Sequence, residues 1–395
     1  MKLILVAGAR PNFMKIAPII NAINRHNENK TSSAPVINYT LVHTGQHYDY
    51  EMSKVFFENL NIPEPDVYLG VGSGNHGEQT GRVMIEFEKL ITGDIPDAVV
   101  VVGDVNSTLA CALTAVKLHI PIAHVEAGLR SLDRTMPEEI NRIVTDVLSD
   151  YLFTTCEAGN NNLRREGIPE EKIFLVGDVM IDTLLAYREK ALKTDILRKL
   201  NIVSDNKEKI IDYCLLTLHR PSNVDDKNSF LKILKALQKV SKQIPLIFPV
   251  HPRTKKQIET FNIKQFFENT PYNAWYPLPP KIYSIDPLSY LNFLNLMMHA
   301  KFVLTDSGSI QEETMVLNVP CLTLRDTTER PDTITEGTNI LVWNNTQKII
   351  EEAAKIMKGR GKKSKFSKQS DGKASERIVK ILARKFKSKN AEKTF

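Results

Sequence analysis

The run at residues 98–102, one Ala followed by four Val, limits the fold more than any other part of the chain. A continuous apolar run of this length is typical of a parallel strand that is buried on both faces. Similar short runs alternate with segments of helical spacing along most of the 395 residues. This alternation predicts an α/β protein built from parallel, doubly wound sheets with right-handed crossovers.

Both halves of the chain follow this scheme. Strands are expected at residues 2–8, 39–44, 98–102, 120–125, 152–155, 173–176, 214–218, 246–250, 302–304, 321–324 and 340–342. Helices are expected at residues 12–26, 51–60, 80–91, 109–118, 138–148, 182–209, 230–243, 287–299, 310–317, 347–357 and 375–386. Because the chain is long for one core, we expect two Rossmann-like domains, at 1–186 and 187–372, followed by a C-terminal helix and basic tail at 373–395.

The net charge of +6 is unevenly distributed. From Lys358 onward the chain has 14 Lys and Arg against 3 Asp and Glu, so the rest of the chain is acidic. The basic charge therefore belongs to the tail, which we interpret as a solvated helix face, and the body does not predict nucleic-acid binding. No apolar run approaches the roughly 20 residues that cross a membrane, so membrane insertion is not expected.

The N-terminus and the cysteines favour a cytoplasmic protein. The first apolar run meets Arg10 and Pro11 too soon for a signal peptide, and it fits a buried first strand. The four cysteines lack CxxC spacing, and each lies in or beside an apolar segment: Cys111, Cys156, Cys214 and Cys321. We expect reduced core residues, with neither a disulfide framework nor a metal site.

Residues 303–330 predict a strand, a tight polar turn, a helix and a second strand. The Ser-Gly-Ser turn at 307–309 falls at the helix N-terminus, where free backbone N–H groups and the helix dipole favour an anion such as phosphate. Glu313 lies one turn further in, where a carboxylate can accept hydrogen bonds from ribose hydroxyls. Arg325 and Arg330 follow the next strand and can face the same anion. An ordinary helix cap without a ligand explains the turn equally well.

Polar residues also follow other predicted strands, at the sheet edge where such folds bind ligands. Arg10 and Lys15 come after the first strand and can hold a diphosphate, although either residue alone is better explained as a surface cation. Asp104 follows the run of valines, and its alternative role is a helix cap. His219 and His251 each end a strand of the second half, which favours a role at the site over that of a hydrogen-bonded core residue.

Two glutamates complete this set. Glu126 directly follows an apolar strand, so we expect a partly desolvated carboxylate suited to proton transfer. Its alternative role is an ion pair with Arg130 or Arg134. Glu138 follows Pro137 at a helix start, where an acidic residue is also ordinary. Carboxylates, a histidine and cations around one edge suit acid–base chemistry on a substrate with an anionic leaving group, and the chain has no GxSxG, Walker or GxGxxG motif.

Together these segments resemble the non-hydrolysing UDP-N-acetylglucosamine 2-epimerases over nearly the whole chain. The segments that carry the resemblance are GARPNFMKIAPII, VVGDVNSTLA, HVEAGLRS, MPEEINR, LHRPSN, FPVHPR, LTDSGSIQEE, LRDTTERP and DGKASERI. The resemblance implies a GT-B-like fold, with two Rossmann-like domains facing a cleft that holds the nucleotide sugar. It also implies reversible epimerisation at C2 by elimination and re-addition of UDP through a 2-acetamidoglucal, without a cofactor.

The resemblance assigns roles residue by residue. Its catalytic residues fall on Asp104, Glu126, Glu138 and His219. Its substrate-binding residues fall on Arg10, Lys15, Phe293, Ser307, Gly308, Ser309, Glu313 and Arg330. In this assignment Glu126 and Glu138 exchange protons at C2, and Asp104 assists. His219 stabilises the departing diphosphate with Arg10, while Glu313 holds the ribose and Phe293 the uracil region. A homodimer is also implied.

The sequence departs from the best-known family members at two motifs. Residues 8–12 read GARPN where GTRPE is common, and residues 219–222 read HRPS where HRRE is common. The second change removes an Arg from a region associated with regulation by a second UDP-sugar, so that regulation is not predicted. The segments HTGQHYD and FFENLNIP resemble the branch that acts on UDP-2,3-diacetamido-2,3-dideoxyglucuronate, which is the alternative substrate. A hydrolysing 2-epimerase and a GT-B glycosyltransferase are the remaining alternatives.

Overall fold

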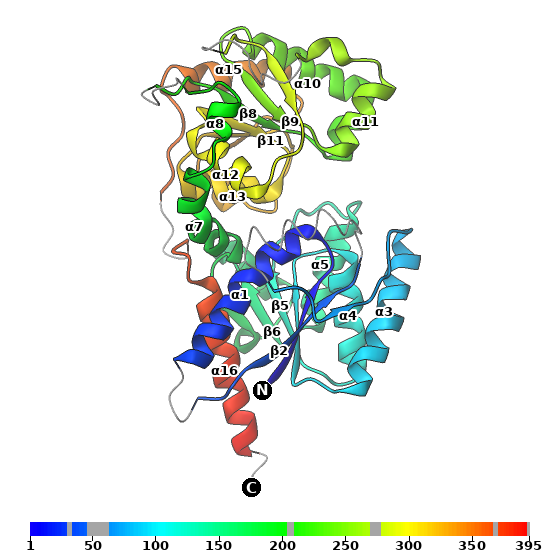
Figure 1. Cartoon of the computed structure of the whole chain (residues 1–395). Helices are drawn as coiled ribbons and strands as arrows, with labels where there is room; N and C mark the ends of the chain where they lie inside the picture. Colours follow the sequence, from blue (N-terminus) through cyan, green and yellow to red (C-terminus); the bar gives the residue numbers. More distant parts are fainter. Residues whose placement is uncertain (30–33, 46–62, 204–208, 269–277, 366–369, 393–395) are drawn as a thin grey trace. The chain divides into compact units, whose positions relative to one another are not determined.

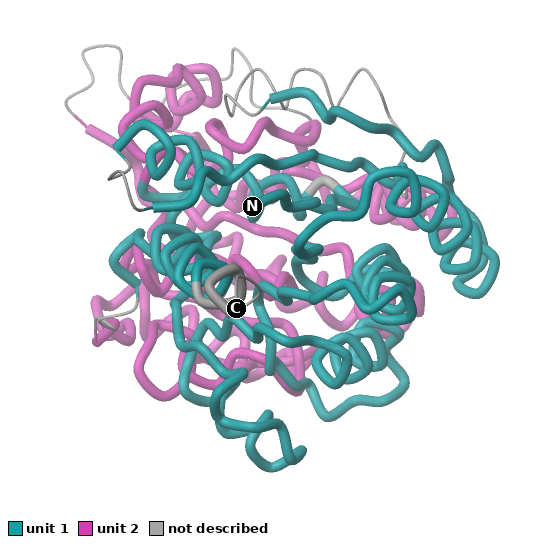
Figure 2. Tube along the Cα trace, turned by 90° about the horizontal axis from the view of Figure 1, so that it is seen from below, with its two compact units in different colours: residues 1–185, 367–395 teal, residues 186–366 magenta. Residues whose placement is uncertain are grey.

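A computed structural model of the chain describes residues 1–29, 34–45, 63–203, 209–268, 278–365 and 370–392 (Figure 1). The helix predicted at 51–60 lies outside these residues. The chain divides into two compact units, Met1–Leu185 with Ser367–Phe395, and Ala186–Phe366 (Figure 2). The C-terminal residues, which the sequence analysis treated as a separate segment, thus belong to the first unit. None of the described helices is both long and apolar enough to cross a bilayer.

Seven parallel strands form the sheet of unit 1 within the described residues, in the order β3-β2-β1-β4-β5-β6-β7. The strands are β1 Lys2–Ala7, β2 Asn38–His43, β3 Val67–Tyr68, β4 Ala98–Val102, β5 Ile122–Ala127, β6 Tyr151–Thr154 and β7 Ile173–Leu175. Every residue of β4 is buried, as its valine run predicts. The strand order reverses between β1 and β4, so this is the switch point where ligands bind in open α/β sheets.

Helices cover both faces of this sheet. They are α1 Arg10–Glu28, α3 His76–Gly93, α4 Asn106–Lys117, α5 Pro137–Leu148, α6 Glu157–Arg165, η1 Glu170–Lys172, the first part of α7 Val179–Leu192, and α16 Ala374–Glu392. Because the strand order reverses, right-handed crossovers place α1 on one face and α4 with α5 on the other. Helix α16 packs along α1 (Figure 1). Its first backbone N–H groups and the Ser375 hydroxyl donate to the buried Asp182 carboxylate of α7.

Unit 2 repeats the scheme with six described strands in the order β10-β9-β8-β11-β12-β13, all parallel. The strands are β8 Cys214–Thr217, β9 Leu246–Pro249, β10 Ile282–Ile285, β11 Phe302–Thr305, β12 Cys321–Thr323 and β13 Asn339–Leu341. Its helices are α8 Ile196–Lys199, α9 Pro221–Val224, α10 Lys227–Val240, α11 Pro252–Thr260, η2 Lys264–Phe266, α12 Tyr290–His299, α13 Gly308–Leu317, α14 Asp332–Thr335 and α15 Thr346–Met357. The switch point of this sheet lies between β8 and β11.

The predicted fold class is confirmed: the protein is α/β and GT-B-like, with two Rossmann-like doubly wound units. The long helix predicted at 182–209 is wrong, because α7 ends at Leu192 and the next helix among the described residues is the short α8. Asn295 of α12 donates to the backbone carbonyl of Thr194 at 3.2 Å, which is a tertiary contact that local spacing does not reveal. The strands β3 and β10 and the polar helix α6 were also missed. Strand β3 has two residues and β10 four, and α6 buries one large apolar side chain, Leu163, so each gives only a short or weak pattern.

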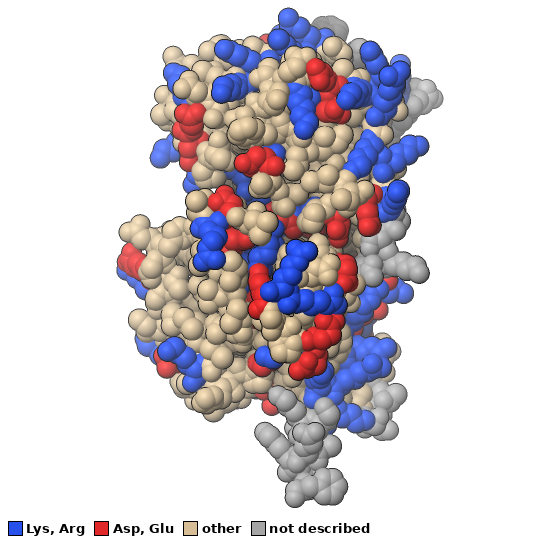
Figure 3. Space-filling model, turned by 180° about the vertical axis from the view of Figure 1, so that it is seen from behind, with Lys and Arg blue, Asp and Glu red and all other residues tan. Residues whose placement is uncertain are grey.

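Basic and acidic side chains are mixed over the face in Figure 3, without an extended area of one sign. Helix α16, which carries much of the excess positive charge, buries its apolar side chains against the unit. These include Ile378, Leu382 and Phe386. The basic residues of α16 therefore lie mainly on the solvated side of a packed helix, as the charge run predicted.

Gly128, just after β5, provides a test of the packing in unit 1. Its φ of 79° is unfavourable for other residues, and an added Cβ would lie 2.5 Å from the carbonyl oxygen of Gly159. Gly167 has a φ of 82° but no atom within 4 Å of an added Cβ. We expect Gly167→Ala to cost about 1–2 kcal/mol for its backbone conformation alone. Gly128→Ala should lower the free energy of unfolding by more, because it adds the overlap.

Urea titrations followed by far-UV circular dichroism measure both variants. Equal destabilisation of the two variants would contradict the close approach of Gly128 to Gly159.

Candidate active site

The turn from β1 into α1 is fastened to β4 at the switch point of unit 1. The backbone N–H groups of Gly8 and Ala9 donate to Asn12 Oδ1 at 3.1 and 2.8 Å. The amide of Asn12 in turn donates to the Val102 carbonyl at 3.0 Å. The predicted phosphate ligand Arg10 begins α1 in this turn, but its side chain lies outside the described residues.

Lys15 and Glu126 form a buried ion pair at the same switch point. Their side chains are 11% and 7% exposed, so the pair is largely removed from water. A Cβ added at Gly103 would lie 2.9 Å from Lys15 Nζ and 3.5 Å from Glu126 Oε2, and the pair therefore packs against the backbone next to Asp104. The predicted alternative, a pair between Glu126 and Arg130, is not found among the described contacts.

Glu126 has a strained backbone. Its φ is 73°, and the register between β5 and β6 shifts at this residue, which marks a β-bulge. A left-handed conformation costs a residue with a side chain about 1–2 kcal/mol, and such strain is often found where a side chain must be redirected for function. The bulge brings the carboxylate to Lys15 instead of leaving it in the plain alternation of a strand.

The two glutamates that begin α5 lie in different environments. Glu139 is buried and accepts hydrogen bonds from the Ser131 backbone and hydroxyl, the Leu132 backbone and Arg142. Burial alone would raise its pKa, but these hydrogen bonds and the Arg142 charge lower it. Glu138 is exposed and has no side-chain hydrogen bond within the described part of the chain. Of the two, only Glu138 is available to a ligand.

Asp104 is held by the same arginine as Glu139. Arg142 Nη1 donates to Asp104 Oδ2 at 2.6 Å, while the Asp104 side chain stays 32% exposed. The amide of Asn141 donates to the Asp104 carbonyl at 2.9 Å. Asp104 is therefore a positioned, partly exposed carboxylate, and its predicted alternative as a cap of α4 is not observed because no side chain caps that helix.

A second buried network, which the sequence analysis missed, lies behind these carboxylates. His124 of β5 contacts Asp146 of α5, and Asp146 also pairs with Arg130 at 2.7 Å. Arg130 in turn forms two hydrogen bonds with Glu166. Asp146 and Glu166 thus lie on either side of the Arg130 guanidinium, and His124 lies beside Asp146. The partners of His124 come from separate elements, so the sequence does not show that they meet. The one signal for this network is that His124 belongs to the family-like segment HVEAGLRS.

In unit 2, His219 follows β8 and is held by Asp306, which follows β11 at the switch point. His219 Nδ1 lies 2.9 Å from Asp306 Oδ1, and the His219 side chain is 40% exposed. The fully buried Asp306 also accepts from the backbone N–H groups of His219 and Arg220 and from Asn223. Burial would raise the pKa of Asp306, but His219 and these backbone donors lower it. Asp306 therefore holds the tautomer and orientation of His219.

The other predicted histidine, His251, lies beside His219, with ring centroids 5.6 Å apart. Burial, followed by the nearby His219 and Arg253, lowers the pKa of His251. At neutral pH this favours a neutral His251 beside the Asp306-bound His219.

Helix α13 begins at Gly308 with Ser307 as its N-cap residue, and the Ser307 and Ser309 hydroxyls lie 3.3 Å apart. A Cβ at Gly308 would lie 2.5 Å from Glu329 Oε1 and 2.8 Å from Arg330 Nη1. A side chain at this position would have to displace the ends of two charged side chains that are themselves ion-paired. The predicted polar turn is observed, and it has a buried charged cluster directly behind it.

This cluster centres on Glu329. Arg325 and Arg330 donate to its two oxygens at 2.6 and 2.7 Å, and Arg330 Nε also contacts Glu312. Burial would raise the pKa of Glu329, but Arg330 and Arg325, with a contribution from Arg220, lower it strongly. Nη1 of Arg325 is buried without a hydrogen-bond partner among the described residues. Arg325 and Arg330, with Arg220 nearby, place cationic groups beside a helix N-terminus, which suits an anion.

Glu313 and Phe293, predicted to contact the nucleoside, lie on neighbouring helices. Glu313 of α13 is buried and accepts a hydrogen bond from the Tyr290 hydroxyl at 3.1 Å. Phe293 is half-buried and lies three residues after Tyr290 on α12, so the two side chains share a helix face. Unit 2 thus has a carboxylate, an aromatic ring and a phosphate-type turn on two helices.

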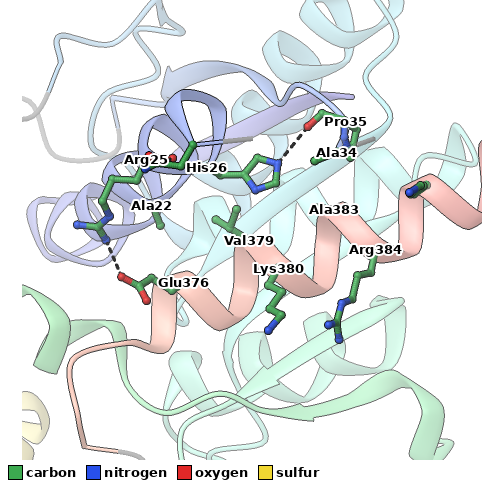
Figure 4. A pocket seen from close by; sticks show the side chains of 12 residues that line it. Ala22, Arg25, His26, Ala34, Pro35, Glu376, Val379, Lys380, Ala383 and Arg384 are labelled. Atoms are coloured by element: carbon green, nitrogen blue, oxygen red, sulfur yellow. Dashed lines mark hydrogen bonds and ion pairs between the residues drawn. The ribbon is translucent and has the colours of Figure 1, made fainter. Parts of the chain in front are cut away.

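A cavity of about 490 Å³ lies between α1 and α16 (Figure 4), but it contains none of the predicted site residues. Its charged groups are partly satisfied internally: Arg25 pairs with Glu376 at 3.3 Å, and His26 contacts the Pro35 carbonyl at 3.0 Å. Lys380 and Arg384 extend away from His26. Since the last turns of α1 form its wall, the cavity lies at the opposite sheet edge from Asp104 and Glu126.

The two doubly wound units, each with charged side chains at its switch point, define a GT-B-like α/β protein. The chain belongs to the UDP-N-acetylglucosamine 2-epimerase family, whose sequence model matches residues 29–383. The predicted family is thereby confirmed.

Relatives of known name match nearly the whole chain. UDP-N-acetylglucosamine 2-epimerase of Methanocaldococcus jannaschii is 47% identical over 388 residues, which cover 97% of this chain and 99% of the relative. The crystal structure of that species' UDP-GlcNAc 2-epimerase in complex with UDP-GlcNAc and UDP matches with a TM-score of 0.83, 45% identity and coverage of 97% and 100%. UDP-2,3-diacetamido-2,3-dideoxy-D-glucuronate 2-epimerase of Pseudomonas aeruginosa is 39% identical, with coverage of 97% and 100%.

The Glu329 cluster predicts a specific dependence of stability on pH. The pKa of Glu329 is lowered in the folded state from an ordinary value of 4.5. Its stabilisation is therefore fully present above that value and is lost as the pH falls below it toward the folded pKa. Glu329→Gln should lower the free energy of unfolding at pH 7, and it should make the acid slope of stability shallower by up to about 1.4 kcal/mol per pH unit.

Urea unfolding followed by far-UV circular dichroism over this pH range tests this slope. Glu336→Gln, at an exposed carboxylate of the same unit, is the matched control and should keep the wild-type slope. An unchanged acid slope in Glu329→Gln would contradict the charged cluster.

Proposed function

We propose that this protein catalyses the reversible epimerisation of UDP-N-acetylglucosamine to UDP-N-acetylmannosamine at C2. The observation that carries the proposal is the set of carboxylates at the unit 1 switch point, Asp104, Glu126 and Glu138, in a chain that matches a UDP-GlcNAc 2-epimerase over 97% of its length. Carboxylates in contrasting environments suit proton removal and return, whereas a glycosyl transfer needs an acceptor and no exchange at C2.

The reaction proceeds through elimination and re-addition. A carboxylate removes the C2 proton, a double bond forms between C1 and C2, and UDP leaves C1 with the electrons of the C1–O bond. This gives 2-acetamidoglucal and UDP. UDP oxygen then adds back to C1 while a second carboxylic acid delivers a proton to the opposite face of C2. Atoms and charge balance over the cycle, so neither an oxidant nor a cofactor is required.

Glu126 and Glu138 suit the two proton transfers because their surroundings differ. The buried Lys15 cation favours the ionised form of Glu126, which then acts as a base. Glu138 is exposed and free of side-chain partners within the described residues, so it exchanges protons readily with water. Asp104 is fixed by Arg142 and assists by positioning the sugar. In this scheme Lys15 has two roles: it pairs with Glu126, and it binds the substrate diphosphate.

Unit 2 supplies most of the residues that bind UDP. The turn at Ser307, Gly308 and Ser309 donates to phosphate oxygens from the start of α13, with Arg330 beside it. Nη1 of Arg325, which is buried without a hydrogen-bond partner in the part of the chain that the structure describes, supports the same role. Glu313 accepts from the ribose hydroxyls and Phe293 contacts the uracil region. His219, oriented by Asp306, donates to the departing diphosphate together with Arg10.

The same proposal extends to the setting of the enzyme. We infer a homodimer in the cytoplasm that supplies UDP-N-acetylmannosamine for polysaccharide synthesis, by analogy with the family. The alternative substrate, UDP-2,3-diacetamido-2,3-dideoxyglucuronate, is favoured by the 39% identity to the Pseudomonas aeruginosa enzyme. The higher identity of 47% to a UDP-GlcNAc 2-epimerase favours UDP-GlcNAc. Comparison of kcat/KM for the two UDP-sugars distinguishes them.

Incubation of the purified protein with UDP-GlcNAc alone tests the reaction. Proton NMR should show UDP-ManNAc without any added acceptor, and in D₂O the C2 position of both sugars should acquire deuterium. Release of free ManNAc with UDP would instead identify a hydrolysing enzyme. No reaction without an acceptor, together with sugar transfer in the presence of one, would identify a glycosyltransferase.

Replacement of Glu126 by Gln tests the proton-transfer role. The amide cannot accept the C2 proton, so kcat should fall by about 100-fold or more and deuterium incorporation should fall in parallel. UDP binding, measured by calorimetry, should be largely retained because most of its proposed ligands lie in unit 2 and the amide of Gln still offers an oxygen to Lys15. Glu88→Gln, at an exposed carboxylate of α3, is the matched control and should behave as wild type. Unaltered deuterium exchange in Glu126→Gln would remove Glu126 from this role.

A further inference from the structure

A buried carboxylate, Asp146 of α5, links the two segments that carry the unit 1 carboxylates. Its Oδ1 lies 2.6 Å from His124 Nδ1, and its Oδ2 accepts the backbone N–H of Gly128 at 3.0 Å. Gly128 comes two residues after Glu126, so this hydrogen bond holds the end of the bulge. Arg130 Nη2 lies 2.7 Å from the same oxygen, so Asp146 has a cationic partner in addition to the imidazole.

His124 extends this link to the neighbouring strand end. Its Nε2 lies 2.9 Å from the carbonyl oxygen of Gly103, the residue that directly precedes Asp104. The backbone N–H of Gly103 donates to the Val125 carbonyl at 3.0 Å, next to Glu126. Gly103 has a φ of 67°, so its carbonyl is turned by a conformation that favours glycine. One imidazole ring therefore spans the distance between the Asp104 turn and the helix that supports the Glu126 bulge.

Both ring nitrogens of His124 face groups that can only accept a hydrogen bond. A peptide carbonyl has no proton to give, and Asp146 is held ionised by Arg130 and by the backbone N–H of Gly128, which both contact its Oδ2. Two accepted hydrogen bonds require a proton on each nitrogen. The geometry therefore fits an imidazolium, which is completely buried and neutralised by the carboxylate beside it.

We propose that His124 and Asp146 are positioning residues for the epimerisation, in which a buried imidazolium–carboxylate pair holds Asp104 and Glu126 at fixed positions relative to each other. Neither residue is placed among the groups that contact the substrate. The proposal rests on the proposed function, since it assigns these two residues a part in the same reaction. It adds that the spacing of the two carboxylates depends on a charged pair behind the sheet edge.

Two substitutions of His124 test its hydrogen bonds to Asp146 and to Gly103 separately. The amide of Asn occupies the region of Nδ1 and keeps a donor for Asp146, but it loses the bond to Gly103. The amide of Gln reaches the region of Nε2 and keeps the bond to Gly103, but it loses the bond to Asp146. A small displacement of catalytic groups lowers the rate by up to about 100-fold. We expect such a loss of kcat in His124→Asn, with KM for UDP-GlcNAc changed by no more than about twofold.

Loss of spacing should also let the intermediate escape. In His124→Asn a larger fraction of turnovers should release 2-acetamidoglucal and UDP, measured by proton and phosphorus NMR, because protonation at C2 becomes slow relative to dissociation. His124→Gln should lie between Asn and wild type. A purely structural role predicts that activity falls only with the fraction of folded protein, with no change in KM or in escape. A folded His124→Asn with wild-type kcat and no released glucal would overturn the proposal.

Measurements on the protein without substrate keep this inference separate from the proposed function. In protein with ¹⁵N-labelled histidine, the His124 signals, assigned by their loss in His124→Gln, should show both nitrogens protonated at pH 7.5. The amide of Gly128 should exchange with D₂O at least about 10-fold faster in Asp146→Asn than in wild type. An unprotonated ring nitrogen, or unchanged exchange, would overturn the positioning pair even if wild type epimerises UDP-GlcNAc. Wild-type protein could instead give both expected observations and yet fail to epimerise UDP-GlcNAc. That result would contradict the proposed function and the catalytic part of this inference. It would still support the contacts that join His124, Asp146 and Gly128.

Discussion

Charged groups buried at the carboxyl edges of the two sheets must each find an opposite charge or several hydrogen bonds, because an unpaired buried charge costs several kcal/mol. In unit 1 this requirement joins Lys15 to Glu126, and Arg142 to Asp104 and Glu139. The backbone around the site depends on these ion pairs. The bulge at β5, the turn after β4 and the start of α5 all lie where these pairs can form.

Unit 2 meets the same requirement with different chemistry. Asp306 can be buried because it accepts hydrogen bonds from backbone and side-chain donors around His219. Glu329 can be buried because it lies between two arginines. These carboxylates are kept ionised in the folded state, and each orients cationic or titratable groups toward the sheet edge. The result is a group of arginines beside the α13 N-terminus, in contrast to the carboxylates of unit 1. This division agrees with a reaction in which one domain binds an anion and the other moves protons.

The sequence predicted most of the strands, because a parallel strand buried on both faces leaves a continuous apolar run. The run at β4 was predicted residue for residue. It also predicted that the polar turn before α13 would begin a helix. The sequence pattern predicted the wrong end for α7, because the contact of Asn295 with Thr194 joins residues that are far apart in the chain. It also missed β3 and β10, which are short. The side-chain partners of the predicted site residues were the least accessible to sequence analysis.

The sequence by itself determined the class of fold, the order of the strand-end motifs and the family, since these follow from hydrophobic pattern and from residues in linear order. Only the tertiary structure decided which charges are paired. It separated the exposed Glu138 from the buried Glu139, joined Lys15 to Glu126 instead of Arg130, and brought His124 to Asp146 across 22 residues. Ion pairing depends on distances of a few ångströms between side chains from different elements, and a linear pattern does not contain those distances.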